Sequence, residues 1–177
     1  MTEGAVVIEQ VGWGALPSHT LALGAMLAAT VNDGGAVGFV QPFSATDGEH
    51  FFTNTIAPQI LSGERALFIA CAGTDVAGTV QLIMGLPANQ PHRCELAKMM
   101  VHPSARRRGI GALLVTAALD HARAAGRTMI TLDTKVGDGA ERLYERLGFV
   151  SAGILPDYAL DPDRAALHGT RLMYRYL

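Results

Sequence analysis

The sequence has little charge, few aromatic side chains and almost no cysteine. Only 17% of its 177 residues are charged, 6% are aromatic, and the formal net charge is −2. An average soluble domain has roughly 25% charged residues. Because duplex binding depends on many cationic contacts with phosphate, this composition argues against it, and we expect no nucleic-acid partner. Hydrophobic residues make up 49% of the chain, which excludes an intrinsically disordered protein.

The sequence also lacks the features of disulfide-rich, metal-binding and membrane proteins. Cys71 and Cys94 both lie in apolar runs and are too few for a disulfide framework or a zinc cluster, so we expect reduced core cysteines and no metal. The longest apolar stretch, around 66–73, is far shorter than the roughly 18 residues of a membrane span. The N-terminal segment carries an acid and no base, unlike a secretory signal. We therefore expect a cytoplasmic protein without membrane contact.

The length predicts a single domain over residues 1–177. Period-2 and period-3.6 hydrophobic patterns predict strands and helices respectively. In chain order we expect a strand at 5–10, helices at 21–29 and 47–61, strands at 66–72, 78–84 and 93–101, a helix from Gly109, a strand at 128–132, a helix at 139–147, and strands at 149–155 and 170–177. A proline-marked loop is expected over 156–164. Helices on a mixed sheet are typical of an α/β domain.

A glycine turn joins strand 93–101 to the following helix and predicts an anion site. The amides of a helix's first turn are unpaired and face the positive end of the helix dipole, and glycine lets a phosphate approach the backbone closely. The spacing matches neither a P-loop nor a dinucleotide fingerprint, and such a turn alone is more often a plain connection. The candidate diphosphate-binding residues are Arg106, Arg107, Arg108, Gly109, Ile110, Gly111 and Ala112.

Glu95 is a candidate general base within the strand 93–101. Strand alternation places it on one face with Met99 and Val101, and apolar surroundings disfavour a charged carboxylate. The alternative is a solvated residue at the edge of the sheet, paired with Arg93 or Lys98.

Asp133 and Tyr144 are two further candidates. Asp133 follows the strand 128–132, at the edge where open α/β sheets bind ligands, although it could equally form a turn or cap a helix. Tyr144 falls on the apolar face of the helix 139–147, where a core tyrosine is the simpler interpretation.

Two motifs resemble the signatures of one enzyme family. The sequence Arg-x-x-Gly-x-Gly at 106–111 follows Val-His-Pro at 101–103, and 140–149 reads Ala-Glu-Arg-Leu-Tyr-Glu-Arg-Leu-Gly-Phe. Both resemble motifs of the GNAT family of N-acetyltransferases, and the order of elements resembles that fold over nearly the whole chain. The resemblance implies an α/β fold whose mixed, mostly antiparallel sheet has about seven strands, splayed parallel middle strands and about four flanking helices.

The resemblance implies an acyltransferase that uses acetyl-CoA to acetylate an amine by direct attack. The glycine turn would bind the pyrophosphate, and the backbone of Met99, Met100 and Val101 would pair with the pantetheine arm, although their side chains suit a core. Tyr144 would donate a proton or a hydrogen bond to the departing thiolate. Gly137 stands where many members have a coenzyme-contacting asparagine, so no side-chain contact is expected there.

Shorter segments resemble a family member that inactivates an amino-acid-like β-lactam toxin; these segments are 34–39, 95–106, 132–134 and 155–168. The resemblance implies a small, amino-acid-like acceptor amine, such as a β-lactam toxin or antibiotic, and a homodimer. Glu95 and Asp133 would together bind and deprotonate the amine, and the resemblance does not say which of the two is the base. The residues expected to line the acceptor site are Gly35, Phe39, Tyr158 and His168.

Two alternatives stay open at this point. The acceptor could be a protein N-terminus or a lysine, because the composition gives no sign of a peptide groove. The chain could also be a non-catalytic module that binds coenzyme A as a sensor or a structural ligand.

Overall fold

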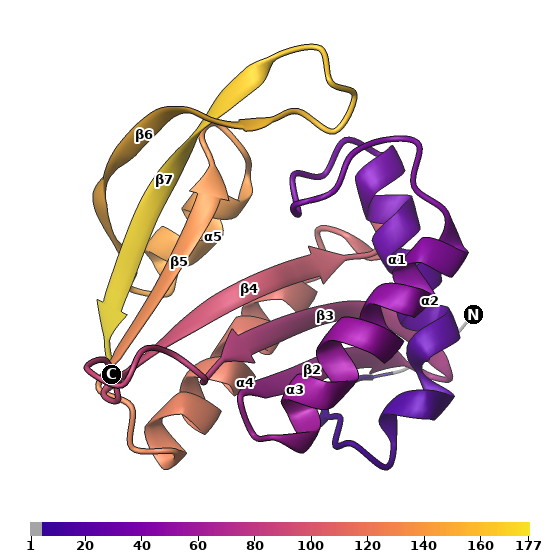
Figure 1. Ribbon diagram of the computed structural model, residues 1–177, viewed down its shortest axis with the longest axis horizontal. Helices are drawn as coiled ribbons and strands as arrows, with labels where there is room; N and C mark the ends of the chain where they lie inside the picture. Colours follow the sequence, from indigo (N-terminus) through magenta and orange to yellow (C-terminus); the bar gives the residue numbers. More distant parts are fainter. Residues whose placement is uncertain (1–4) are drawn as a thin grey trace.

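The computed structural model describes residues 5–177. They form one sheet with helices on both faces (Figure 1). The strands are β1 (Val6–Gln10), β2 (Arg65–Ala72), β3 (Asp75–Ile83), β4 (Arg93–Val101), β5 (Met129–Lys135), β6 (Val150–Leu160) and β7 (Leu167–Tyr176). The α-helices are α1 (Thr20–Asn32), α2 (Ala45–Phe51), α3 (Ala57–Leu61), α4 (Ile110–Ala124) and α5 (Ala140–Arg146). The spatial order is β1-β2-β3-β4-β5-β7-β6, and only β4 and β5 are parallel neighbours.

This architecture confirms the expected α/β fold with a mixed, mostly antiparallel sheet of seven strands. A π-helical turn, Phe52–Ile56, joins α2 to α3, so the helix expected at 47–61 is continuous but irregular. Pro58 lies in the first turn of α3 and has no amide proton, so the helical hydrogen-bond pattern must change around it.

The loop expected at 156–164 is wrong over its first half, because β6 continues through Pro156 to Leu160. The pairing of β6 with β7 is irregular between Leu155 and Ala159. A proline cannot donate a hydrogen bond to the ladder, so sheets accept it at bulges and in edge strands. β6 is an edge strand and carries such a bulge, which is why the proline does not end it.

Two apolar clusters hold the helices against the sheet. On one face, α4 packs through Ile110 and Leu114 onto the cluster that includes Val80 and Leu82. On the other, the helices α1 to α3 pack onto the cluster that includes Leu67. Both clusters pack on the half of the sheet from β1 to β4, and the first also extends to β5 and β7 through Ile130 and Met173.

The parallel strands β4 and β5 pair over one short stretch and then diverge (Figure 1). Their register extends only from Arg93–Met129 to Glu95–Thr131. Beyond it, Lys98 has a φ of 50°, and the pairing of β4 with β3 shifts there. A bulge inserts one residue and bends a strand away from its neighbour. The facing edges of β4 and β5 are thus left with backbone groups that the sheet does not use.

A bridge closes the outer side of the space between the two halves of the sheet. The loop 33–43, which follows α1, meets the turn between β6 and β7, where the Gln41 amide donates to the Pro162 carbonyl at 2.7 Å. At the same turn the Asp161 carboxylate contacts the Lys135 ammonium, which lowers the pKa of Asp161. The Gln41–Pro162 hydrogen bond thus joins two walls above the diverging strands, one made by α1 and the loop 33–43 and the other by the half of the sheet from β5 to β6.

Two glycines let α1 and α2 touch backbone to backbone. A Cβ added at Gly24 would lie 2.5 Å from the Glu49 amide nitrogen, and one added at Gly48 would lie 2.5 Å from the Gly24 carbonyl oxygen. Both distances are shorter than any van der Waals contact allows. This close approach fixes α1 and therefore the loop that follows it.

We expect Gly24→Ala to lower the free energy of unfolding by about 1–3 kcal/mol, because the helices must separate to admit the methyl group. Urea denaturation measures the change. Gly12→Ala is the matched control, since a Cβ there has no neighbour within 4 Å among the described residues. A gain of about 1 kcal/mol in Gly24→Ala, the usual effect of replacing a helical glycine, would contradict the close contact.

Candidate active site

The glycine turn forms a cradle of backbone amides at the start of α4. Gly109, with a φ of 77°, precedes the first helical residue, and Arg107 has a φ of 65°. Within residues 5–177, no backbone hydrogen bond is recorded to the amides of Arg107, Gly109, Ile110 or Gly111. Successive amides of this kind, at the positive end of a 15-residue helix, form a site for an anion.

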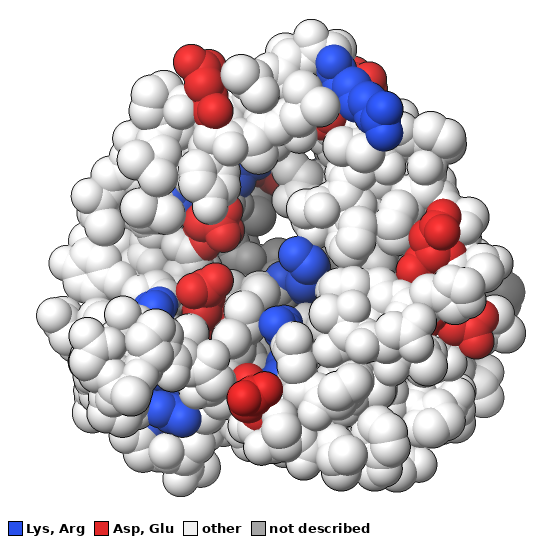
Figure 2. Space-filling model, viewed as in Figure 1, with Lys and Arg blue, Asp and Glu red and all other residues white. Residues whose placement is uncertain are grey.

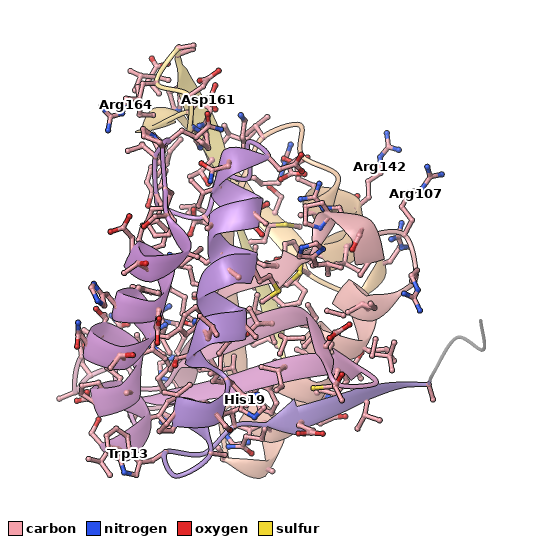
Figure 3. The ribbon with its side chains drawn as sticks, turned by 90° about the vertical axis from the view of Figure 1, so that its right-hand side faces the viewer. Trp13, His19, Arg107, Arg142, Asp161 and Arg164 are labelled. Carbon is pink, nitrogen blue, oxygen red and sulfur yellow. The ribbon has the colours of Figure 1, made fainter. Side chains whose placement is uncertain are left out.

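The arginines of this turn have different surroundings. Arg106 Nη1 lies 2.6 Å from Asp33 Oδ2, and its Nε donates to the Val101 carbonyl at 3.3 Å, so this side chain ties the turn to the end of α1. Arg107 and Arg142 of α5 both extend outward from the same side of the molecule (Figure 3).

Gly111 allows α4 to pack closely on its neighbours. A Cβ added there would lie 3.0 Å from Leu143 Cδ2 and 3.6 Å from Met99 Sδ. The side chains of Met99 and Val101 pack against one core cluster, and Met100 belongs to the other, as expected of core residues. Because β4 no longer pairs with β5 at these positions, their backbone edge faces the gap.

Tyr144 is buried in the core cluster below this gap. It is 4% exposed, and its ring lies edge-on to Phe149 with centroids 5.6 Å apart. Within residues 5–177, no hydrogen bond to its hydroxyl is recorded. Burial raises the pKa of Tyr144, and the charges of Asp138 and Asp133 raise it further. The hydroxyl is therefore a protonated donor at neutral pH.

Glu95 has charged neighbours, and the apolar surroundings expected for it are wrong. Its Oε2 lies 3.5 Å from Arg93 Nη1, and 36% of its side chain is exposed. The bulge at Lys98 shifts the alternation, so Met99 and Val101 pack on the opposite face of the sheet. The alternative of an Arg93 pair is the one that the structure records.

Asp133 lies on β5 beyond the point of divergence. The Thr170 hydroxyl lies 3.0 Å from its Oδ2, which holds one carboxylate oxygen in place. The charge of Asp133 raises the pKa of Tyr144 and opposes the lowering of the pKa of Lys98. Asp133 is thus within electrostatic reach of groups from both β4 and α5.

Two cations near Glu95 and Asp133 were not among the site residues expected from the sequence. Lys98 of β4 lies with its Nζ 5.6 Å from the centroid of the Phe39 ring. Arg65 of β2 donates to Gln59 and to Gln81, each at 2.6 Å. The sequence carried a signal for both residues, because Arg65 directly precedes the apolar run of β2 and Lys98 interrupts that of β4.

The four residues expected to line the acceptor site are spread over both walls. Phe39 packs on Phe43 with centroids 4.8 Å apart. A Cβ added at Gly35 would clash with Thr30, so this glycine seats the loop on α1. Tyr158 is 52% exposed on β6, whereas His168 Nδ1 lies 2.9 Å from Asp161 Oδ1.

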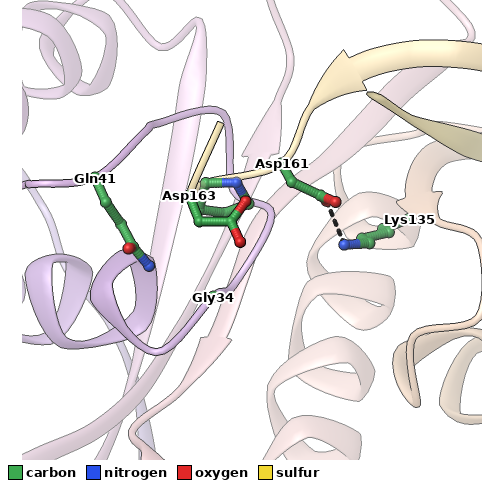
Figure 4. Close-up of a pocket in the computed structure, with 6 residues that line it drawn as sticks. Gly34, Gln41, Lys135, Asp161 and Asp163 are labelled. Carbon is green, nitrogen blue, oxygen red and sulfur yellow. Dashed lines mark hydrogen bonds and ion pairs between the residues drawn. The ribbon is translucent and has the colours of Figure 1, made fainter. Parts of the chain in front are cut away.

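A hollow with charged residues of both signs around it opens between the two walls (Figure 2). Its outer end is a cavity of about 140 Å³ beneath the bridge, where Lys135 and Asp161 contact each other (Figure 4). The cavity is lined by Gly34, Gln41, Lys135, Asp161, Pro162 and Asp163.

The two cysteines are poor nucleophiles. Burial raises the pKa of the Cys94 thiol to about 11 and also raises that of Cys71. The thiolate is the reactive form, so neither residue suits a covalent acyl intermediate at neutral pH. No cluster of three or more potential metal ligands and no helix able to cross a membrane occurs within residues 5–177.

Comparisons with known proteins identify the family. The model of the acetyltransferase (GNAT) family matches residues 31–149. A Salmonella typhimurium protein described as an acetyltransferase and solved with its cofactor acetyl-CoA has a TM-score of 0.78 and 17% identity, covering 98% of this chain and 95% of that one. The ribosomal-protein-alanine N-acetyltransferase of Brucella melitensis has a TM-score of 0.77 and 19% identity, covering 97% and 99%.

A third similar structure is described as a phosphinothricin N-acetyltransferase, with a TM-score of 0.73 and 18% identity over 98% of this chain and 99% of that one. The unpaired amides at the start of α4 and the strand β4 that separates from β5 both lie within the residues that the family model matches. The chain belongs to the GNAT family and is an acetyl-CoA-dependent N-acetyltransferase.

Proposed function

We propose that this enzyme acetylates the amine of a small, amino-acid-like acceptor by direct attack. The observation that carries the proposal is the grouping of Glu95, Asp133 and Lys98 around the divergence of β4 and β5. Two carboxylates suit an ammonium group, and a cation suits an acceptor that also carries an anion. Release of coenzyme A thiol with a panel of amino acids and β-lactam toxins tests the proposal, and the absence of release with every amine would overturn it.

The backbone provides the coenzyme site in this proposal. The unpaired amides that start α4 suit the diphosphate, with Arg107 and Arg108 at the rim, and the free edge of β4 at 99–101 suits the amide-bearing pantetheine arm. Bound there, acetyl-CoA supplies the acetyl thioester. An amide of the same edge polarises its carbonyl. Arg106, tied to Asp33, positions the turn.

Glu95 and Asp133 act on the acceptor's ammonium group. An alkylamine with a pKa near 10 must lose a proton before it can attack, which costs roughly 4 kcal/mol at neutral pH. A carboxylate in direct contact, or through one water, accepts that proton. The two residues lie on adjacent strands at the start of the gap, so both can contact one ammonium group.

Tyr144 acts on the departing thiolate. Because its pKa is raised by burial, the hydroxyl is a weaker acid than a thiol and stabilises the thiolate by a hydrogen bond. The absence of a recorded hydrogen bond to this hydroxyl within residues 5–177 leaves it available for that contact.

The acceptor class rests on two arguments. The segments 34–39, 95–106, 132–134 and 155–168 resemble the tabtoxin resistance protein, which acetylates an amino-acid-like β-lactam toxin. The Gln41–Pro162 bridge also favours a small molecule, because it closes the side on which a long polypeptide would pass. A protein acceptor is the second candidate, since one similar structure is a ribosomal-protein-alanine N-acetyltransferase. Mass spectrometry of acetylated proteins in cells with and without the gene separates the two.

We expect Tyr144→Phe to lower kcat roughly tenfold to a hundredfold while the Kd of acetyl-CoA changes little, because only the hydrogen bond to the leaving group is lost. Steady-state kinetics and calorimetry measure the two quantities. Tyr176→Phe is the matched control, as Tyr176 is 72% exposed at the end of β7. An unchanged kcat in Tyr144→Phe would show that Tyr144 only packs in the core and does not act on the thiolate.

We expect Glu95→Gln and Asp133→Asn each to lower kcat/KM, by roughly a hundredfold or more for the residue that takes the proton. That variant should recover activity as the pH rises towards 10, where the acceptor amine deprotonates without help. A residue that only binds the ammonium group should raise KM at every pH. The pH profile of kcat/KM thus assigns the base, and Glu145→Gln, on the exposed side of α5, is the control. Flat and unaltered profiles in both variants would contradict the mechanism.

We further propose that two copies of the chain associate through the β6–β7 hairpin. β6 ends the sheet, and an edge strand with exposed apolar side chains associates unless it is covered. The hairpin carries much of the exposed apolar surface of the described residues, namely Val150, Ile154, Leu155, Tyr158, Leu160, Leu167, Leu172 and Tyr176.

We expect the enzyme to have the mass of a dimer in light scattering after gel filtration, and the double variant Ile154→Lys, Leu160→Lys to have that of a monomer, because charge is costly in an apolar interface. Leu21→Lys on α1, where Leu21 is 68% exposed, is the control and should stay dimeric. A monomeric wild-type enzyme at all concentrations would contradict the proposal.

A further inference from the structure

We propose that Lys98 binds a carboxylate of the acceptor, so that the enzyme selects acceptors with a free carboxylate over the corresponding amides. This inference rests on the function proposed above and names the group that recognises the second charge of the acceptor.

The side chain of Lys98 extends from β4 to the loop 33–43. Lys98 is the bulged residue of β4, with a φ of 50°, a conformation that a non-glycine residue adopts at some energetic cost. Its Nζ lies 3.1 Å from the position that a Cβ would take at Gly38, in the loop 33–43 that follows α1. The ammonium group thus lies between the sheet and that loop, above the point where β4 and β5 separate.

The ammonium group lacks the partners that a half-buried cation requires. Within residues 5–177, Nζ lies near Gly38 and 5.6 Å from the centroid of the Phe39 ring, and no hydrogen bond or ion pair to it is recorded. Burial lowers the pKa of Lys98, the charge of Arg65 lowers it further, and Asp133 and Glu95 act in the opposite direction. An anion bound beside Nζ would supply the missing hydrogen-bond acceptor and offset the loss of water.

The two other cations near the divergence of β4 and β5, Arg65 and Arg93, already have polar partners. Arg65 donates to Gln59 and Gln81, and Arg93 donates to Gln90 and Thr131 and lies next to Glu95. Of the three cations, Lys98 is the one for which no hydrogen bond or ion pair is recorded within residues 5–177. With the cations Arg65, Arg93 and Lys98 facing the carboxylates Glu95 and Asp133, the group carries one excess positive charge.

This arrangement complements a zwitterion. The two carboxylates attract the ammonium group of an amino acid towards the divergence of the strands, and Lys98 attracts its carboxylate towards the loop wall. A polar contact with a charged partner changes affinity more than a neutral one does, so the loss of either charge should be visible in acceptor kinetics.

A purely structural role for Lys98 makes a different prediction. Its contact with Phe39 could serve only to hold the loop 33–43 in place. In that case, removal of the ammonium group would disturb the site for every acceptor alike. The preference between a carboxylate and its amide separates the two roles, because loop placement affects both acceptors equally.

The experiment measures kcat/KM of the full-length enzyme for a panel of α-amino acids, each paired with its α-carboxamide. We expect the wild-type enzyme to prefer the free acids roughly tenfold to a hundredfold, and Lys98→Met to reduce that preference to near unity, mainly by raising KM for the acids. Lys98→Arg should retain a preference for the acids. Phe39→Leu, which removes the ring and keeps the ammonium group, should leave the acid-to-amide ratio unchanged.

Calorimetry with acetyl-CoA and thermal unfolding establish that each variant is folded and binds the coenzyme. Equal losses on acids and amides in Lys98→Met would overturn the inference, as would a wild-type enzyme without a preference; in both cases the proposed acetylation of small amines would stand. If coenzyme binds but no panel amine releases thiol, the proposed function fails, and this inference fails with it.

Discussion

The separation of β4 from β5 is the constraint on which the remaining structure depends. The strands pair from Arg93–Met129 to Glu95–Thr131, and the bulge at Lys98 then turns β4 aside. Within a sheet, unpaired backbone edges are costly unless another group uses them. Here the edges face a gap, and the amides at the start of α4 and the side chain of Tyr144 lie next to it. One bulge thus creates both the free strand edge that we propose for the coenzyme and the opening that we propose for the acceptor.

Close packing at glycines keeps the walls of this opening in place. Gly24 and Gly48 bring α1 and α2 into backbone contact, and Gly111 seats α4 on β4 and α5. Gly35 seats the loop that follows α1 against Thr30. These glycines act through the absence of a side chain, since a methyl group would move a whole helix or loop and with it the residues that face the hollow.

Charge is concentrated where the fold is open. The chain as a whole has a net charge of only −2, yet Arg65, Arg93, Glu95, Lys98 and Asp133 surround the divergence of the strands. Most of them are held by polar partners: Gln59, Gln81 and Thr131 orient the arginines, and Thr170 orients Asp133. A weakly charged protein therefore presents a strongly polar site, with its donors and acceptors fixed before an acceptor arrives.

The sequence alone determined the α/β class, the order of elements, the family, and the positions of the glycine turn, Glu95, Asp133 and Tyr144, because these follow from local periodicity and from motifs of fixed spacing. Only the tertiary structure decided that Glu95 has charged rather than apolar neighbours and that Arg106 is tied to Asp33. It also decided that β6 continues past Pro156 and that Lys98 lies against Gly38. The reason is physical: a one-residue bulge reverses strand alternation, and contacts between segments distant in the chain depend on packing that no local pattern encodes.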